Sequence, residues 1–169
     1  KFFENLPYGY KNNCETLYPA TNKLNTMPKK ENIIIFTGKL NKSKGYDIFG
    51  RATINILKKF KNWRSYAIGN ERREKYNFKH KNFKILNWLP HSRILNFYKK
   101  SSISVVCSRW QEPFGRTAME SAACGCATIT TDRGGLKETF KTNLTLRNLS
   151  YLSLEKMISK IIRNKKKLK

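Results

Sequence analysis

The chain has 169 residues, of which 12% are aromatic and 39% hydrophobic, which suits one domain with a sizeable core and excludes a disordered chain. Its formal net charge of +24 indicates attraction to polyanions: nucleic acid, an anionic membrane surface or phosphorylated ligands. The basic residues are mostly lysines spread along the chain, with one dense run at 165–167, so we favour a solvated lysine-rich surface over a dedicated nucleic-acid binder. No apolar run approaches the ~20 residues that a membrane-spanning helix requires.

The first part of the chain, residues 1–30, carries a weak structural pattern that Pro7, Pro19 and Pro28 interrupt. It predicts at most one short strand, over 15–18, followed by a linker. Because the chain begins at Lys1 without Met or a signal-like apolar run, we expect it to start inside a longer protein; removal of a preceding segment by processing is the alternative.

A regular pattern begins near residue 32, where short apolar, β-branched runs alternate with segments of helical spacing. Strands are predicted at 33–36, 66–68, 83–86, 103–107 and 127–130. Helices are predicted at roughly 45–60, 91–99 and 115–124, and at a terminal stretch that includes 154–162. Buried strands that alternate with helices specify an α/β fold with a doubly wound parallel sheet.

The cysteines and histidines do not predict a metal site, because no pair has the spacing of metal ligands. The four cysteines are Cys14, Cys107, Cys124 and Cys126. The last three lie in or beside apolar segments, so we expect buried free thiols and a reducing cytoplasm. His80 and His91 have polar neighbours in the sequence and are expected at the surface.

Ligands of such sheets bind outside the carboxyl ends of the strands, where the strand order reverses. The segments to inspect are therefore 38–45, 69–70, 87–89, 108–117 and 131–135. In the first of them, Gly38, Lys39 and Lys44 suit a phosphate, although the segment is neither a Walker A loop nor a GxGxxG fingerprint. In the fourth, Glu112 precedes a predicted helix start, where free N–H groups and the helix dipole attract anions.

These motifs, in this order, resemble the C-terminal half of the GT-B retaining glycosyltransferases of family 4. The resemblance covers about residues 31–140: Gly38-Lys39 to Lys44-Gly45, then Glu112-Pro113-Phe114-Gly115 with Glu120 after seven intervening residues, then Gly134-Gly135-Leu136 and Glu138. It implies a Rossmann-like domain over 31–169 that binds a nucleoside-diphosphate-sugar. Residues 1–30 would then be the end of the preceding N-terminal domain and the linker.

The resemblance also implies roles for single residues. Lys39 and Lys44 would grip the donor diphosphate beside Gly38, with Lys39 in place of the more usual arginine, so that a point charge replaces a bidentate fork. Glu112 would face the transferred sugar, and Glu120 would accept hydrogen bonds from the ribose. The remaining contacts would come from the amides of Phe114, Gly115 and Arg116, the hydroxyl of Thr117, and the main chain near Leu89, which would receive the base.

The residues alone also allow plainer readings. Glu120 and Arg116 could be an exposed helix pair worth only ~0.3–0.5 kcal/mol, and Glu112 could simply complement the helix dipole. Trp110 could line a sugar pocket or pack under its loop.

The activity implied by the resemblance is transfer of a sugar from a nucleoside-diphosphate-sugar to an acceptor hydroxyl with retention, without cofactor or metal. We expect a role in cell-envelope polysaccharide or lipopolysaccharide synthesis.

 The acceptor glycan or lipid-linked saccharide would be bound through the N-terminal domain, so this chain alone would be inactive. We expect the protein in the cytoplasm, in peripheral contact with the anionic inner face of the membrane. The alternative is a basic nucleic-acid-binding or membrane-interaction domain without catalysis.

Overall fold

The computed structural model describes residues 17, 19–21, 26–139 and 143–164. The strand predicted over 15–18, the lysine run at 165–167 and Cys14 therefore fall outside the described residues, apart from Leu17. None of the helices in the described part of the chain combines the length and the apolar character needed to cross a membrane.

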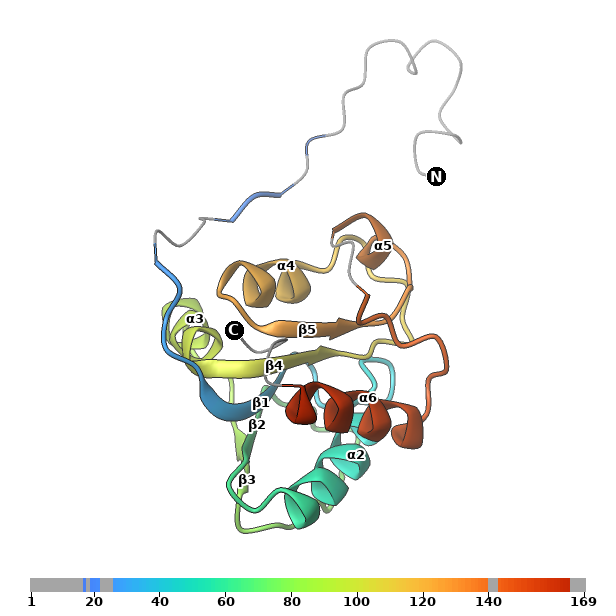
Figure 1. Cartoon of the computed structure of the whole chain (residues 1–169). Helices are drawn as coiled ribbons and strands as arrows, with labels where there is room; N and C mark the ends of the chain where they lie inside the picture. The colour runs from blue at the N-terminus through green and yellow to red at the C-terminus, as the bar shows by residue number, and fades with distance from the viewer. Residues whose placement is uncertain (1–16, 18, 22–25, 140–142, 165–169) are drawn as a thin grey trace, which may run out of the picture.

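A five-stranded parallel sheet forms the centre of the molecule (Figure 1). Its strands are β1 (Glu31–Thr37), β2 (Arg64–Ile68), β3 (Phe83–Leu86), β4 (Ser101–Val106) and β5 (Ala127–Thr130). They lie in the order β3-β2-β1-β4-β5, with parallel pairing throughout. The chain thus builds outward from β1 to β3 and then returns to the other side of β1, so the strand order reverses between β1 and β4.

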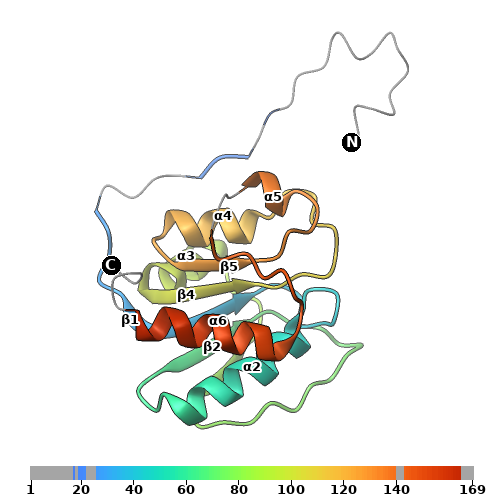
Figure 2. The ribbon, with the colours of Figure 1, turned by 45° about the vertical axis from the view of Figure 1, so that its right-hand side comes forward.

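Helices cover both faces of this sheet (Figures 1 and 2). The helices are α2 (Tyr46–Lys59), α3 (His91–Lys100), α4 (Arg116–Ala123), α5 (Leu136–Thr139) and α6 (Tyr151–Arg163). Helices α2 and α6 pack together on one face, while α3, α4 and the short α5 lie on the other. This arrangement confirms the predicted doubly wound α/β fold.

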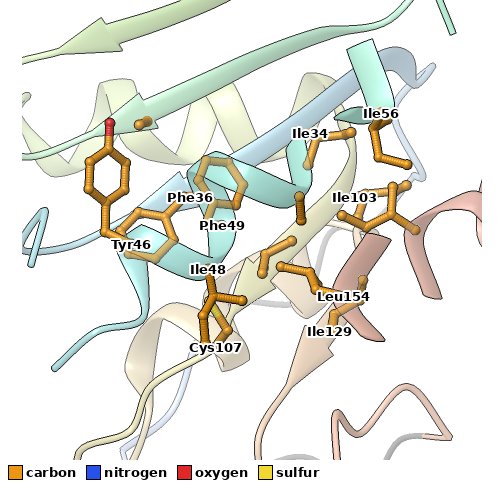
Figure 3. Packing of buried hydrophobic residues seen from close by; sticks show 14 of the residues in the cluster. Ile34, Phe36, Tyr46, Ile48, Phe49, Ile56, Ile103, Cys107, Ile129 and Leu154 are labelled. Atoms are coloured by element: carbon orange, nitrogen blue, oxygen red, sulfur yellow. The ribbon is translucent and has the colours of Figure 1, made fainter. Parts of the chain in front are cut away.

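The core consists of two apolar layers, which follow from the alternation of side chains along β1. Ile34 and Phe36 point toward α2, where they meet Phe49, and the same layer reaches Leu154 of α6 (Figure 3). Ile35 points to the opposite face and belongs to the layer under α3 and α4. Because these side chains are 0–2% exposed, each contributes about 1.5–3 kcal/mol of hydrophobic stabilisation.

The connection between β2 and β3 departs from the strand–helix alternation, because residues 69–82 contain no helix. In its place, the stacked rings of Tyr76 and Phe78 pack edge-on against Tyr46 of α2, at centroid distances of 5.5 and 5.6 Å. Gly50 makes room for this packing, since a Cβ there would lie 2.1 Å from the Phe78 ring. These aromatic side chains cover α2 where a crossover helix would otherwise lie.

Two further details correct the predicted pattern. β3 is not a buried strand, because it forms the sheet edge and leaves Lys84 and Ile85 exposed. Helix α5 was not predicted, since four residues are too few to give a helical periodicity. The remaining predicted elements are confirmed with shifted ends; the terminal helix, for example, begins at Tyr151, where the Ser150 hydroxyl accepts a hydrogen bond from the Ser153 N–H.

Candidate functional site

A cavity of about 310 Å³ opens at the carboxyl ends of β1 and β4, where the strand order reverses. Its lining comes from the ends of these two strands and from the segments that follow them. The lining residues are Phe36, Thr37, Gly38, Lys44, Val106, Ser108 and the run 112–117. Ligands of open α/β sheets bind at this place, so the topology and the cavity indicate the same site.

The first wall is the loop between β1 and α2, which folds back on itself. The Gly45 N–H donates to the Lys42 carbonyl, and the Lys44 N–H donates to the Asn41 side chain, each at 3.0 Å. Gly45 adopts a left-handed conformation with φ of 76°, and a Cβ there would lie 2.0 Å from the Cys107 carbonyl oxygen. Glycine is therefore needed for the loop to close against the residues that follow β4.

The segment that follows β4 is tied to this loop. The Ser108 hydroxyl and the Arg109 N–H both donate to the Ser43 carbonyl, at 3.2 and 2.8 Å. The Arg109 guanidinium binds both oxygens of Asp47, in the first turn of α2, at 2.6 and 2.8 Å. Burial acts to raise the pKa of Asp47, but the hydrogen bonds and charge of Arg109 outweigh it and hold that pKa below its ordinary value. These contacts fix the two walls of the cavity relative to each other.

The second wall contains the start of α4. Gly115 is the N-cap residue, with φ of 95°, and no side chain caps the helix. Ala118 N–H donates to the Gly115 carbonyl, and the N–H groups that precede it at the helix start are available to an anion. Gly134 and Gly135 pack behind this wall, where the Gly135 N–H donates to the Glu112 carbonyl at 2.6 Å. A Cβ at Gly135 would lie 2.3 Å from the Pro113 carbonyl oxygen, so this close approach requires glycine.

An ion pair joins the two walls across the cavity. Lys44 Nζ lies 2.6 and 2.8 Å from the two carboxylate oxygens of Glu112. The side chains are 31% and 12% exposed, so the pair is partly shielded from water. The sequence did not predict this contact, because the two residues lie 68 positions apart and both were assigned to a ligand.

Most of the residues that the resemblance singled out lie together in this cavity, but three do not. Gly38, Lys44, Glu112, Phe114, Gly115, Arg116 and Thr117 all line it. Lys39 is exposed outside the lining, and Leu89 packs in the apolar layer under α3. Trp110 is 58% exposed and neither lines the cavity nor packs under the loop.

Glu120 is the third residue implied by the resemblance, after Lys39 and Leu89, that lies outside the lining, and it is buried on α4. Its carboxylate accepts a hydrogen bond from Arg116 Nη2 at 3.4 Å. The same carboxylate lies 3.1 Å from His91 Nε2. Glu120 is only 7% exposed whereas the Arg116 side chain is 69% exposed, so the helix pair that the sequence alone allowed is present but is buried on its carboxylate side. His91 is exposed as expected, but its contact with Glu120 was missed because it joins two helices distant in the sequence.

The cysteines behave as predicted within the described residues. Cys107, Cys124 and Cys126 are buried free thiols. Burial raises the pKa of Cys107 and of Cys126 to about 12. In the part of the chain that the structure describes, no group of three or more His, Cys, Asp or Glu side chains could hold a metal ion.

A second hollow, of about 760 Å³, lies on the other side of Glu112 and Pro113. Asp132, Arg133 and Lys137 contribute charges of both signs to its lining. Glu112 therefore lies between the two hollows.

The reversed strand order, the cavity at the reversal point and the helices on both faces define a Rossmann-like α/β domain of the GT-B glycosyltransferase type. The sequence profile described as "Glycosyl transferases group 1" matches residues 20–169. The chain belongs to this family.

Individual relatives agree with this assignment. The chain is 32% identical over 108 residues to an "Uncharacterized 42.6 kDa protein in cps region" of Klebsiella pneumoniae, covering 61% of this chain and 27% of that protein. It is similar to the C-terminal domain of a glycosyl transferase group 1 family protein (LpcC) from Francisella tularensis, with 26% identity, a TM-score of 0.71 and coverage of 89% and 87%.

A third relative shares the fold alone. Anabaena Alr3699/HepE, solved in complex with UDP and glucose, has 18% identity and a TM-score of 0.70, covering 82% of this chain and 41% of that one. The chain thus spans less than half the length of HepE and of the Klebsiella protein.

Proposed function

We propose that this chain is the donor-binding half of a retaining glycosyltransferase, which transfers a sugar from a nucleoside-diphosphate-sugar to an acceptor hydroxyl. The observation that carries the proposal is the single cavity that gathers a lysine, a carboxylate and an uncapped helix start at the point of strand reversal. A diphosphate requires cations and N–H donors, while a sugar requires hydrogen-bond acceptors. The cavity offers both.

The charges suggest how the donor is held. Lys44 and the first-turn amides of α4 bind the diphosphate, and Lys39, just outside the cavity, adds a second positive charge. Glu112 accepts hydrogen bonds from the transferred sugar, and the Thr117 hydroxyl donates to the phosphate. Glu120 binds the ribose, and the main chain near Leu89 receives the base.

Catalysis in this proposal is mainly electrostatic. The bond between the anomeric carbon and the diphosphate oxygen breaks, the acceptor hydroxyl gives its proton to that departing oxygen, and the acceptor oxygen forms its bond on the same face, which retains the configuration. The leaving diphosphate gains negative charge, which Lys39, Lys44 and the amides of 115–117 stabilise without a metal ion or cofactor. We assign no general base among these residues.

The relatives support this proposal and suggest an acceptor. HepE was solved with UDP and glucose, and the Klebsiella protein is encoded in a cps region. We therefore propose a role in the synthesis of a cell-envelope polysaccharide or lipopolysaccharide.

The division of the chain follows from the same proposal. Residues 1–30 end the N-terminal domain and form the linker, and residues 31–169 bind the donor. The acceptor glycan or lipid-linked saccharide is bound through the N-terminal domain, so the 169-residue chain has little or no transferase activity alone. Full turnover by the isolated chain would contradict this division.

The cellular location that we propose is the cytoplasm, at the inner face of the membrane. A formal net charge of +24 favours contact with anionic headgroups, which lie where a lipid-linked acceptor is presented. Co-sedimentation with anionic vesicles, but not with neutral ones, is the expected result.

A screen of UDP-, GDP- and ADP-sugars by thermal shift tests the proposed function and identifies the donor. A ligand that binds the folded chain raises its Tm by an amount that grows with the logarithm of its concentration relative to its Kd. We expect one base to be preferred. If none of these donors shifts the Tm, the proposal is contradicted.

A further inference from the structure

The ion pair between Lys44 and Glu112 has a consequence for which ligand the cavity prefers. Both carboxylate oxygens of Glu112 bind the Lys44 ammonium group, at 2.6 and 2.8 Å. Within the described residues, Lys44 is the only side chain with which this carboxylate forms an ion pair. The lysine and the carboxylate of the site are therefore held in an ion pair with each other.

We propose that Glu112 is a specificity-determining residue, which makes the site favour a nucleotide sugar over the free nucleoside diphosphate by competing for Lys44. This inference rests on the proposed function. An ammonium group has three N–H donors, and Glu112 occupies two of them. A diphosphate that binds Lys44 must therefore displace the Glu112 carboxylate or share the lysine with it.

Displacing the Glu112 carboxylate from Lys44 is unfavourable for a ligand that has no sugar. The Glu112 side chain is 12% exposed, so water replaces the lost hydrogen bonds poorly. The carboxylate would also face the negative charge of the diphosphate across the cavity. A free nucleoside diphosphate does not compensate either effect.

A nucleotide sugar compensates the loss, because its sugar hydroxyls donate hydrogen bonds to Glu112 in place of Lys44. With a nucleotide sugar the Glu112 carboxylate regains hydrogen bonds after it loses Lys44, and with a free nucleoside diphosphate it does not. After transfer, the sugar leaves with the acceptor, and Glu112 is again free to bind Lys44. The pair then favours release of the nucleoside diphosphate.

Lys39 differs from Lys44 in this respect. It is exposed and has no ion pair within the described residues, so it attracts a diphosphate without an internal competitor. The competition is therefore specific to the pair of Lys44 and Glu112.

The test compares Glu112→Gln with wild type by calorimetry, using pyrophosphate, UDP, GDP and ADP as probes, together with the donor found in the screen. Glutamine keeps the shape of the side chain and releases Lys44. We expect Glu112→Gln to bind the preferred nucleoside diphosphate about three- to tenfold more tightly, and pyrophosphate more tightly as well. The ratio of nucleotide-sugar to nucleoside-diphosphate affinity should fall.

Two controls separate this effect from a change in overall charge. Asp132→Asn removes one negative charge from the neighbouring hollow without releasing Lys44, and should leave these affinities within about twofold. In a Lys44→Ala background, Glu112→Gln should give a clearly smaller gain, since no lysine is released and only the repulsion between the carboxylate and the diphosphate is removed. If Glu112→Gln lowers the Tm strongly, Glu112→Asp, which keeps the charge but shortens the reach to Lys44, serves in its place.

The outcomes distinguish this inference from the proposed function. If wild type binds a nucleoside diphosphate and Glu112→Gln binds it equally or more weakly, Glu112 does not compete with the diphosphate for Lys44. The proposed donor-binding function is unaffected by that result. If wild type binds neither the diphosphates nor any nucleotide sugar, the proposed function is wrong, and this inference with it.

Discussion

Arg109, three residues past the end of β4, binds both carboxylate oxygens of Asp47 in the first turn of α2, at 2.6 and 2.8 Å. The contact joins the two segments that form the walls of the cavity. It holds the pKa of Asp47 below its ordinary value in spite of partial burial. The charge pair should therefore contribute to the stability of the fold in a pH-dependent way.

Asp47→Asn should lower the free energy of unfolding at pH 7 by about 1 kcal/mol, the loss expected for a partly exposed but bidentate pair. A carboxyl whose pKa is lower in the folded chain stabilises the fold above its unfolded pKa, and this contribution is lost as the pH falls through its folded pKa. The Tm difference between wild type and Asp47→Asn should thus shrink below pH ~4.

The control for this measurement is Asp132→Asn. Asp132 is exposed and has no ion pair within the described residues, so its loss should change the Tm little at either pH. A Tm difference for Asp47→Asn that stays constant from pH 7 down to pH ~3 would show that the charge of Asp47 is not what stabilises the fold.

Gly45→Ala tests the close approach of the first loop to the end of β4. The new Cβ would lie 2.0 Å from the Cys107 carbonyl oxygen, and the alanine would have to adopt φ of 76°. We expect a loss of stability of about 2 kcal/mol or more, measured by denaturant unfolding.

Gly38→Ala is the matched control, because its added Cβ would meet nothing within 4 Å and only the unusual φ of 138° opposes it. It should destabilise less than Gly45→Ala. Equal effects of the two substitutions would mean that the contact with Cys107 does not constrain the loop.

The buried thiols should react slowly in the native chain. Burial raises the pKa of Cys107 and of Cys126 to about 12, so the reactive thiolate is scarce at pH 8. Alkylation by iodoacetamide, mapped by mass spectrometry, should modify both residues only after denaturation. Rapid modification of Cys107 without denaturant would contradict the packing around it.

His91→Ala tests whether His91 positions the Glu120 carboxylate. The substitution removes the contact at 3.1 Å and leaves Arg116 as the remaining partner of Glu120 among the charged side chains described. Nucleotide affinity should fall about fivefold, the effect of losing about 1 kcal/mol of hydrogen bonding. His80→Ala, away from the cavity, should not change it. If Glu120→Ala weakens binding and His91→Ala does not, the contact is not needed for positioning.

The sequence predicted the elements whose side chains repeat regularly, and it missed contacts between distant segments. The run 33–36 is apolar because both faces of β1 are covered, so its pattern predicts a buried strand. The connection 69–82 has no such pattern, because Tyr76 and Phe78 pack on α2 without any periodic spacing.

The same limit applies to the candidate site. Motif order predicted a site at the carboxyl ends of the strands, and seven of the residues named line one cavity: Gly38, Lys44, Glu112, Phe114, Gly115, Arg116 and Thr117. The ion pairs of Lys44 with Glu112 and of Arg109 with Asp47 join positions 68 and 62 residues apart. No local pattern encodes such pairings, so only the fold could reveal them.

The central claim is that Lys44 and Glu120 hold a nucleoside diphosphate in this domain. Calorimetric titration of the preferred nucleotide sugar into wild type, Lys44→Ala and Glu120→Ala tests it most directly. Removal of a charged hydrogen-bond partner should weaken binding by about tenfold in each variant. Unchanged affinity in both variants, with wild type binding the same ligand, would contradict the proposed site.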